Sequence, residues 1–346
     1  MSIENFVRAM PKAELHVHLE GVWRKDTLLM IADENDARAN IKHFDTWVKL
    51  LDNPDFNRID QITRTVSQWL QYGEDLTRIV YDLGVALSKQ NVRYAEVSVM
   101  PTLYSHMGLT LEAMLEALND GRDRVLRGWG VQMAWILTFP RDDARKADEL
   151  LRFAGTIAAK RAGVVAIGLA GRENPQPVTQ FERVFKNAEK KDILRVPHAG
   201  DVFGVNGTLD TLKLLHPNRI IEGVGAADAP DALQILKDNR VPLDVSMALA
   251  LCMNEYSNYA AYPLRQIVDA GVTLLLSSDM PSYFKTTLSD EYLAAVEHSG
   301  LTINELQDVA LNAVRESFMP DDLQQTMLTE FAQEYTRLSA EHLQTA

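Results

Sequence analysis

Residues 11–21 read PKAELHVHLEG, and this stretch decides between two kinds of parallel α/β fold. Residues 14–21 form a mostly apolar run, which predicts a buried strand. An open, doubly wound sheet that binds nucleotides carries a glycine-rich phosphate turn directly after its first strand. This chain has His16 and His18 at that place instead. The stretch therefore argues against the doubly wound sheet and favours a closed barrel.

Apolar runs of the same kind recur along the chain, with helix-like stretches between most of them. The runs cover residues 14–21, 92–101, 129–140, 164–171, 193–200, 219–227, 241–248 and 272–281. Apolar residues at helical spacing occupy residues 110–127, 144–162, 177–190, 208–215 and 230–239. Apolar strands that alternate with helices predict a parallel sheet covered on both faces. Eight such units in 346 residues predict an α/β fold of the (β/α)₈, or TIM barrel, type.

Two segments exceed what simple strand–helix units need. Residues 25–73 carry several aromatic side chains and predict helical insertions over the barrel mouth. These insertions would serve either as a packing subdomain or as a lid over a substrate. Residues 302–346 predict two or three amphipathic helices that close the far side of the barrel. We expect one domain over residues 1–346, with the barrel roughly at 12–300.

The composition narrows the class of partner. Hydrophobic residues make up 46% and charged residues 24% of the chain, so a large core is possible. A net charge of −13 disfavours nucleic acid and anionic membrane surfaces, which leaves a small-molecule substrate. The single cysteine, Cys252, and the lack of a signal peptide or an apolar membrane span predict a cytoplasmic protein. The oligomeric state is left open.

Four potential metal ligands lie at the expected carboxyl ends of strands, where barrel enzymes place their chemistry. His16 and His18 are two residues apart, so both side chains project from the same face of a strand. His198 ends the fifth run, and Asp279 ends the eighth. Three imidazoles and a carboxylate suit a divalent cation such as zinc and leave a position for water. Iron or manganese would also accept this donor set.

Two carboxylates near these ligands are candidate acids and bases. A metal site that activates water needs a proton acceptor, and it needs an acid for the leaving group. Asp201 follows His198 by three residues, and Glu222 ends the sixth run. The alternatives are that Asp201 caps a helix or forms a turn and that Glu222 forms a salt bridge at the barrel rim.

Further residues are expected at the mouth of the barrel. Glu20 follows the histidine pair, and Gly171 would allow a ligand to approach the backbone closely. Arg172 and Glu173 follow Gly171, and we expect them to form a solvated ion pair.

These motifs resemble those of the adenosine deaminase family. The resemblance is carried, in chain order, by residues 11–21, 164–171, 198–201, 219–223 and 278–292. It implies a (β/α)₈ barrel that binds zinc and removes the 6-amino group of a purine by hydrolysis. The zinc ligands that it implies are His16, His18, His198 and Asp279. It also implies that Glu20 contacts the substrate and that Gly171 approaches the purine ring.

The chain departs from the family pattern around the metal site. The family's proton-shuttling glutamate falls on Asp201, and the histidine that holds the attacking hydroxide falls on Glu222. The family's second aspartate, which bonds a purine ring nitrogen, falls on Met280, a side chain that can neither donate nor strongly accept. Met280, together with Met247, predicts a more apolar contact surface. These departures predict altered specificity, away from ordinary adenosine deamination.

Three hypotheses follow, because a fold does not determine a function. The first is hydrolytic deamination of a purine-like or other aminated N-heterocycle. The second is another metal-dependent C–N hydrolysis or an elimination on this scaffold. The third is a metal-binding relative that has lost catalysis. Asp201 and Glu222 are the catalytic candidates for the first two, and Glu20, Gly171 and Met280 are the substrate contacts.

Overall fold

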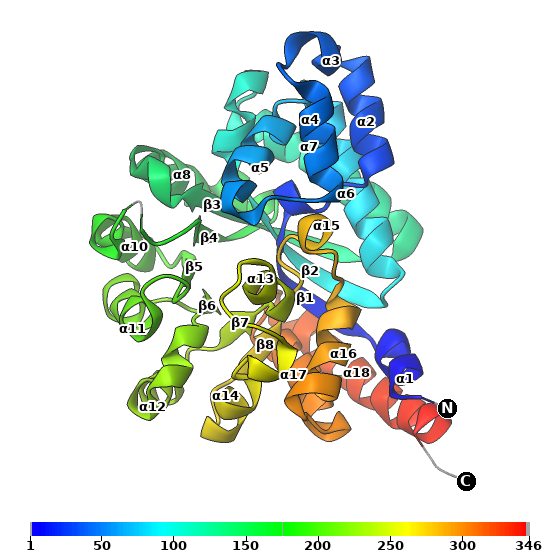
Figure 1. Ribbon diagram of the computed structural model, residues 1–346, viewed down its shortest axis with the longest axis vertical. Helices are drawn as coiled ribbons and strands as arrows, with labels where there is room; N and C mark the ends of the chain where they lie inside the picture. The colour runs from blue at the N-terminus through cyan, green and yellow to red at the C-terminus, as the bar shows by residue number, and fades with distance from the viewer. Residues whose placement is uncertain (1, 175, 344–346) are drawn as a thin grey trace.

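The computed structural model describes residues 2–174 and 176–343, and its centre is an eight-stranded parallel sheet. The strands neighbour one another in chain order, surrounded by helices (Figure 1). They are β1 (Lys12–His18), β2 (Val92–Val99), β3 (Gln132–Pro140), β4 (Val164–Ala170), β5 (Leu194–Ala199), β6 (Ile220–Glu222), β7 (Leu243–Val245) and β8 (Leu274–Leu276). This architecture confirms the predicted TIM barrel.

The barrel closes between β1 and the segment that follows β8. Val17 and Asp279 form an isolated parallel bridge at this seam. The His18 N–H donates to the Asp279 carbonyl at 2.8 Å, and the Asp279 N–H donates to the His16 carbonyl at 3.3 Å. Because the seam lies at the carboxyl ends of the strands, closure of the sheet brings the predicted ligands of β1 and β8 together.

Helices cover the outside of the sheet (Figure 1). In chain order they are α1 (Ile3–Ala9), α2 (Lys25–Glu34), α3 (Ala37–Asn40), α4 (Phe44–Asp52), α5 (Ile59–Ser67), α6 (Gly73–Ser88), α7 (Leu111–Trp129), α8 (Ala147–Ala154), α9 (Ile157–Arg161), α10 (Glu182–Glu189), α11 (Gly204–Leu215), α12 (Pro230–Asn239), α13 (Met247–Cys252), α14 (Leu264–Ala270), α15 (Pro281–Phe284), α16 (Leu288–Ser299), α17 (Ile303–Arg315) and α18 (Asp321–His342). Among the described residues, no helix has the length and hydropathy needed to span a bilayer.

Strands β6, β7 and β8 are each shorter than the apolar runs that predict them. Glu222 and Gly223 adopt positive φ angles of 63° and 70°, which end β6 before the run is complete. The Ser246 hydroxyl caps α13, so the chain leaves β7 for a helix at that point. A run of apolar residues reports burial, and the residues beyond these strands are buried in turns and short helices instead.

Three predicted helices differ in their limits from the observed ones. The stretch 144–162 divides into α8 and α9, because Gly155 ends the first helix and the Thr156 side chain caps the second. The stretch 177–190 contains one turn of 3₁₀ helix before α10 begins. Helix α11 begins at Gly204, four residues before the predicted stretch 208–215.

The insertion between β1 and β2 is helical, as predicted, and consists mainly of α2 to α5. These helices lie together on one side of the barrel (Figure 1, top). Phe44 and Trp69 pack with their rings 4.6 Å apart in the interior of the insertion. Ile59, Asp60, Thr63 and Arg64 contribute to the wall of a pocket at the barrel mouth. The insertion therefore packs as an extension of the main hydrophobic core, and its helix α5 also covers the mouth.

The C-terminal segment packs against the opposite, amino-terminal end of the barrel. Helix α17 contacts β1 and β8, and the Tyr335 hydroxyl on α18 donates to the Pro11 carbonyl at 2.8 Å. Between the two helices, Phe318 packs against an interior cluster that includes Ile136 and Ile221. Residues 344–346 of the predicted tail lie outside the described residues, and the extent of the single domain stays a prediction.

A buried arginine ties four strands together below the pocket. Arg219, immediately before β6, donates to the Glu96 carboxylate at 2.7 Å and to the Leu15 carbonyl at 2.9 Å. Its Nε atom lies 3.4 Å from the Asp244 carboxylate on β7. All three ionic side chains are fully buried, so each depends on the others for compensation of its charge.

Candidate metal centre and active-site pocket

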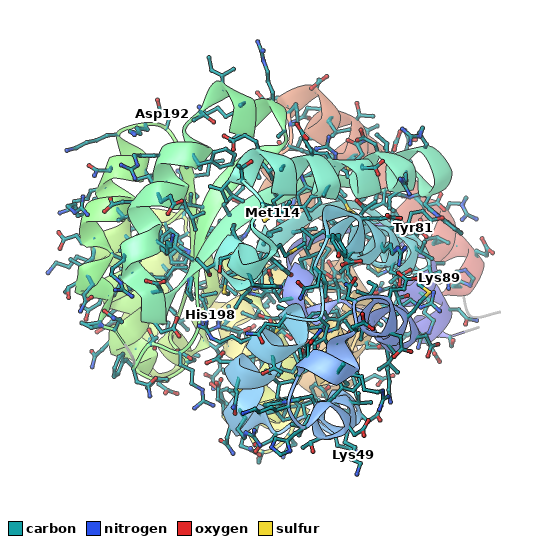
Figure 2. The ribbon with its side chains drawn as sticks, turned by 90° about the horizontal axis from the view of Figure 1, so that it is seen from above. Lys49, Tyr81, Lys89, Met114, Asp192 and His198 are labelled. Atoms are coloured by element: carbon teal, nitrogen blue, oxygen red, sulfur yellow. The ribbon has the colours of Figure 1, made fainter. Side chains whose placement is uncertain are left out.

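The carboxyl ends of the strands surround a pocket that is closed on one side by α5. Its wall includes His18, Met100, Arg141, Gly171, His198 and Asp279, which follow or end six different strands. Figure 2 labels His198 in the interior of the molecule, whereas Lys49, Lys89 and Asp192 lie at its periphery. This is the end of the barrel at which TIM-barrel enzymes bind substrates.

Three of the four predicted ligands form a tight cluster. One potential ligand atom from each of His16, His18 and Asp279 lies within 4.8 Å of the others. The His16 Nε2 atom is 3.1 Å from the Asp279 Oδ2 atom, and the two imidazole rings meet edge to face with centroids 4.7 Å apart. Asp279 has a φ of 55°, a left-handed conformation, and it sits on the seam that closes the barrel. The cluster is therefore fixed by the backbone.

The fourth predicted ligand, His198, lines the same pocket but lies outside this three-residue cluster. Its Nδ1 atom is buried and has no hydrogen-bond partner within the part of the chain that the structure describes. The Nδ1 atoms of His16 and His18 are also buried and unpartnered among the described residues. Buried ring nitrogens without protein partners fit a site that holds a cation.

The pKa shifts of His16, His198 and Asp279 favour the forms that bind a metal, whereas that of His18 does not. Burial lowers the pKa of His198 to about 4 and also lowers the pKa of His16, so both rings are neutral near pH 7. Burial disfavours the charged form of His18 as well, but the nearby Glu20 and Asp279 carboxylates raise its pKa on balance. Burial opposes ionisation of Asp279, yet its contact with His16 and the charges of the histidines lower its pKa. Neutral imidazoles and a carboxylate are the forms that bind a divalent metal.

The structure places the two candidate catalytic carboxylates differently. Asp201 lines the pocket, and its Oδ1 atom is buried without a hydrogen-bond partner in the described segments. This oxygen therefore neither caps a helix nor stabilises a turn. Glu222 is buried and is not part of the pocket wall. Its carboxyl accepts from the Ser246 N–H at 2.9 Å and from the Tyr262 hydroxyl at 3.3 Å. Burial raises the pKa of Glu222 well above its usual range.

The three predicted substrate contacts all line the pocket. One Glu20 oxygen accepts from the Met100 N–H at 2.8 Å, and the other is buried, 3.8 Å from His18 Nδ1. Gly171 has a φ of 93°, which a side chain would disfavour, and it leaves the backbone open to the pocket. Met280 follows Asp279 in the wall. Met247 is fully buried and is not part of the wall, so its predicted contact role is wrong.

The sequence profile named Adenosine deaminase matches residues 11–334, which is most of the chain. The chain belongs to the adenosine deaminase family. Membership confirms the resemblance that its motifs carry, and it confirms the enzyme class, a metal-dependent hydrolase of C–N bonds. The reaction is hydrolytic deamination of an aminated heterocycle.

Individual members of the family that resemble this deaminase differ in their named substrates. It is 30% identical over 330 residues to a putative adenosine/adenine deaminase of Streptomyces coelicolor, covering 93% of this chain and 96% of that protein. It is 28% identical over 318 residues to the aminodeoxyfutalosine deaminase of Streptomyces avermitilis, covering 92% and 89%. Its fold matches the crystal structure of an adenine deaminase from Arthrobacter aurescens with a TM-score of 0.85 and 25% identity, covering 94% and 99%. These relatives are named for different aminated substrates. The substrate of this enzyme therefore depends on the residues that line its own pocket.

The structure of this deaminase corrects a further expectation and adds residues that the motifs did not indicate. Glu173 is only 3% exposed, so it does not form the solvated ion pair expected with Arg172. Its carboxylate instead accepts from the Val202 and Phe203 N–H groups at 3.1 and 2.9 Å. Arg141, which follows β3, is 1% exposed and donates to the His198 carbonyl at 2.6 Å. No local pattern signals either contact, because each joins residues that lie far apart in the sequence.

A further acid, Glu255, lines the pocket of the deaminase beyond α13. Partial burial and, to a smaller extent, the charge of the Asp201 carboxylate raise its pKa to about 7. The pocket thus contains a carboxyl group that can exchange a proton near neutral pH. The sequence offers no motif for it, since it lies in an irregular segment after a short helix.

Proposed function

We propose that this enzyme is a cytoplasmic, zinc-dependent deaminase of an aminated N-heterocycle other than adenosine. The observation that carries the proposal is the buried cluster of His16, His18 and Asp279 at a pocket whose wall includes Met280, where the family pattern has an aspartate that bonds the ring. The cluster supports the metal-dependent reaction. The methionine argues against a substrate that needs a polar partner at that point.

Zinc is the ion that the donor set favours, with iron or manganese as alternatives. Three imidazoles and one carboxylate are borderline to hard donors, which zinc accepts with a low coordination number. His16, His18 and Asp279 would hold the ion, with His198 as the fourth protein ligand from the facing wall. A bound divalent ion supplies Lewis acidity for the activation of water.

Asp201 is the proposed proton carrier for the leaving amine. Its carboxylate lines the pocket, and one of its oxygens has no partner in the described chain, so it is available to a substrate. Glu222 is the second proposed proton carrier. Its carboxyl lies behind the pocket wall, where burial raises its pKa well above its usual range and Ser246 and Tyr262 hold the group in place. A protonated carboxyl can donate a hydrogen bond, which the ionised form cannot.

The pocket wall combines polar and apolar groups. Glu20 and Gly171 offer a carboxylate oxygen and an open backbone. The wall also contains Met280 and four further apolar side chains, Met100, Leu249, Met253 and Phe284. Burial of apolar ring or alkyl surface against these side chains is favourable, whereas a ring nitrogen facing them would lose its hydrogen bond to water. We therefore propose a ring that presents carbon atoms to Met280.

The test is ammonia release by the zinc-loaded enzyme from a panel of aminated purines, deazapurines, pyrimidines and pteridines. We expect turnover of at least one ring, weak activity on adenosine, and large losses in Asp201→Asn and Glu222→Gln. Full activity in both variants would contradict the proposed roles of these carboxyls. Formation of a new carboxylic acid without ammonia would point instead to ring-amide hydrolysis.

A further inference from the structure

The turn that joins β5 to α11 carries two residues of the proposed site, His198 and Asp201. Asp201 has a short side chain with few rotatable bonds, so the backbone of the turn decides where its carboxylate lies. The turn has little support of its own, because Gly200 has a φ of 86° and Phe203, the N-cap residue of α11, cannot cap the helix with its side chain.

Glu173 supplies a substitute for this cap from another part of the chain. One of its oxygens accepts from the N–H group of Phe203, the N-cap residue of α11, and from the N–H group of Val202, which precedes it. A carboxylate is also favoured there by the positive end of the helix dipole. Gly207 leaves the necessary room, since a Cβ atom at that position would lie 2.4 Å from the Glu173 Oε1 atom.

Arg141 holds the other end of the same turn. Its guanidinium donates to the His198 carbonyl, and no carboxylate lies within 4.0 Å of it in residues 2–174 and 176–343. Burial lowers the pKa of Arg141, and the charges of Glu173 and Asp201 act in the opposite direction. The guanidinium therefore lies in the field of both acids and stays charged, since arginine does not lose its proton in proteins.

From these contacts we infer that Glu173 and Arg141 are positioning residues that hold the 198–203 turn, so that the Asp201 carboxylate faces the substrate. Glu173 and Arg141 follow neighbouring strands, β4 and β3, and they bind the two ends of the turn. The Oδ1 atom of Asp201 has no partner among the described residues. The inference rests on the proposed function only for the catalytic role of Asp201.

The test compares variants of Glu173 and Gly207 in the full-length, zinc-loaded enzyme. Glu173→Ala removes the cap, whereas Glu173→Gln keeps a single oxygen that can accept both N–H groups. Gly207→Ala displaces the Glu173 carboxylate without changing its chemistry. Because alanine is the better helix former, this substitution does not weaken α11 itself. We expect Glu173→Ala and Gly207→Ala to lower kcat about 10–100-fold with little change in KM or zinc content, and Glu173→Gln to retain most of the activity.

A matched control removes a helix cap that is remote from the pocket. Glu305 accepts from the Thr302 N–H at 2.8 Å at the start of α17, so Glu305→Ala tests the effect of a lost cap on stability alone. We expect it to lower the melting temperature without lowering kcat. Wild-type kcat in Glu173→Ala, or the same loss of kcat in Glu305→Ala, would overturn the inference.

Hydrogen–deuterium exchange separates this inference from the proposed function. Exchange of residues 198–208 should become faster in Glu173→Ala and in Arg141→Met, and it should stay at the wild-type rate in Glu305→Ala. This measurement does not depend on turnover. It therefore tests whether Glu173 and Arg141 stabilise the turn even if no heterocycle in the panel releases ammonia. Unchanged exchange in both variants would overturn the inference whatever the substrate proves to be.

Discussion

The amide N–H of His18 donates to the carbonyl oxygen of Asp279 across 2.8 Å, and this bond joins the first strand to the segment after the last. The same two residues belong to the buried cluster that is the candidate metal centre. The backbone contacts that close the barrel therefore also bring the residues of the cluster together. A change that opens the seam should disturb both.

The candidate metal centre predicts which substitutions reduce the zinc content of the protein. His16→Ala and Asp279→Asn should each reduce bound zinc well below one ion per chain and abolish turnover, because each removes a donor from the cluster. His198→Ala tests the fourth ligand and should also weaken binding. Atomic absorption after dialysis measures the content. His106, whose ring contacts the Leu70 carbonyl at 2.7 Å, is the control, and His106→Ala should bind zinc normally.

Met280 in the pocket wall predicts a change in ring preference on substitution. Met280→Asp introduces an acceptor at the ring-contacting position, so turnover of the best substrate should fall about tenfold or more relative to adenine and adenosine. Met280→Leu keeps the apolar surface and should leave the preference unchanged. The ratio of kcat/KM for the best substrate to kcat/KM for adenine measures this preference. Equal ratios in all three proteins would show that Met280 does not contact the ring.

Glu291 predicts a pH dependence of stability. Its carboxyl accepts from the Met247 N–H at 2.8 Å and the Thr286 hydroxyl at 2.9 Å, and burial raises its pKa from 4.5 to about 7. The folded state therefore holds a proton that the unfolded state releases above pH 4.5, so its contribution to stability falls as the pH rises towards 7. Between pH 5 and 8 the wild type should lose about 2 kcal/mol more than Glu291→Gln. Urea unfolding at constant zinc measures the difference, and parallel pH profiles would contradict the assignment.

The buried ionic cluster below the pocket predicts a large loss of stability. Glu96→Gln removes the charge that faces Arg219 at 2.7 Å, and a buried guanidinium that loses a partner costs about 3–5 kcal/mol. Glu334→Ala removes a surface partner of Arg337 and should cost less than about 1 kcal/mol. Urea midpoints compare the two. A loss in Glu96→Gln as small as that in Glu334→Ala would mean that Asp244 alone compensates the arginine.

The strand and ligand predictions succeed where the sequence pattern is local. Eight apolar runs locate all eight strands, because burial on both faces of a parallel strand leaves a continuous apolar signature. The spacing of His16 and His18 places both rings on one face, since side chains alternate along a strand. The same patterns overestimate the length of β6 to β8, because residues such as Val224 and Ala248 are buried in short helices beyond the strands.

By itself, then, the sequence determined the barrel, the histidine pair and the positions where the family pattern changes. Only the tertiary structure decided that Asp279 meets those histidines across the seam, that Glu222 turns towards Ser246 and Tyr262, and that Glu173 caps a helix thirty residues away. The physical reason is that periodicity records which side chains are buried, whereas partners far apart in the chain depend on strand register and on how the loops pack over the barrel mouth.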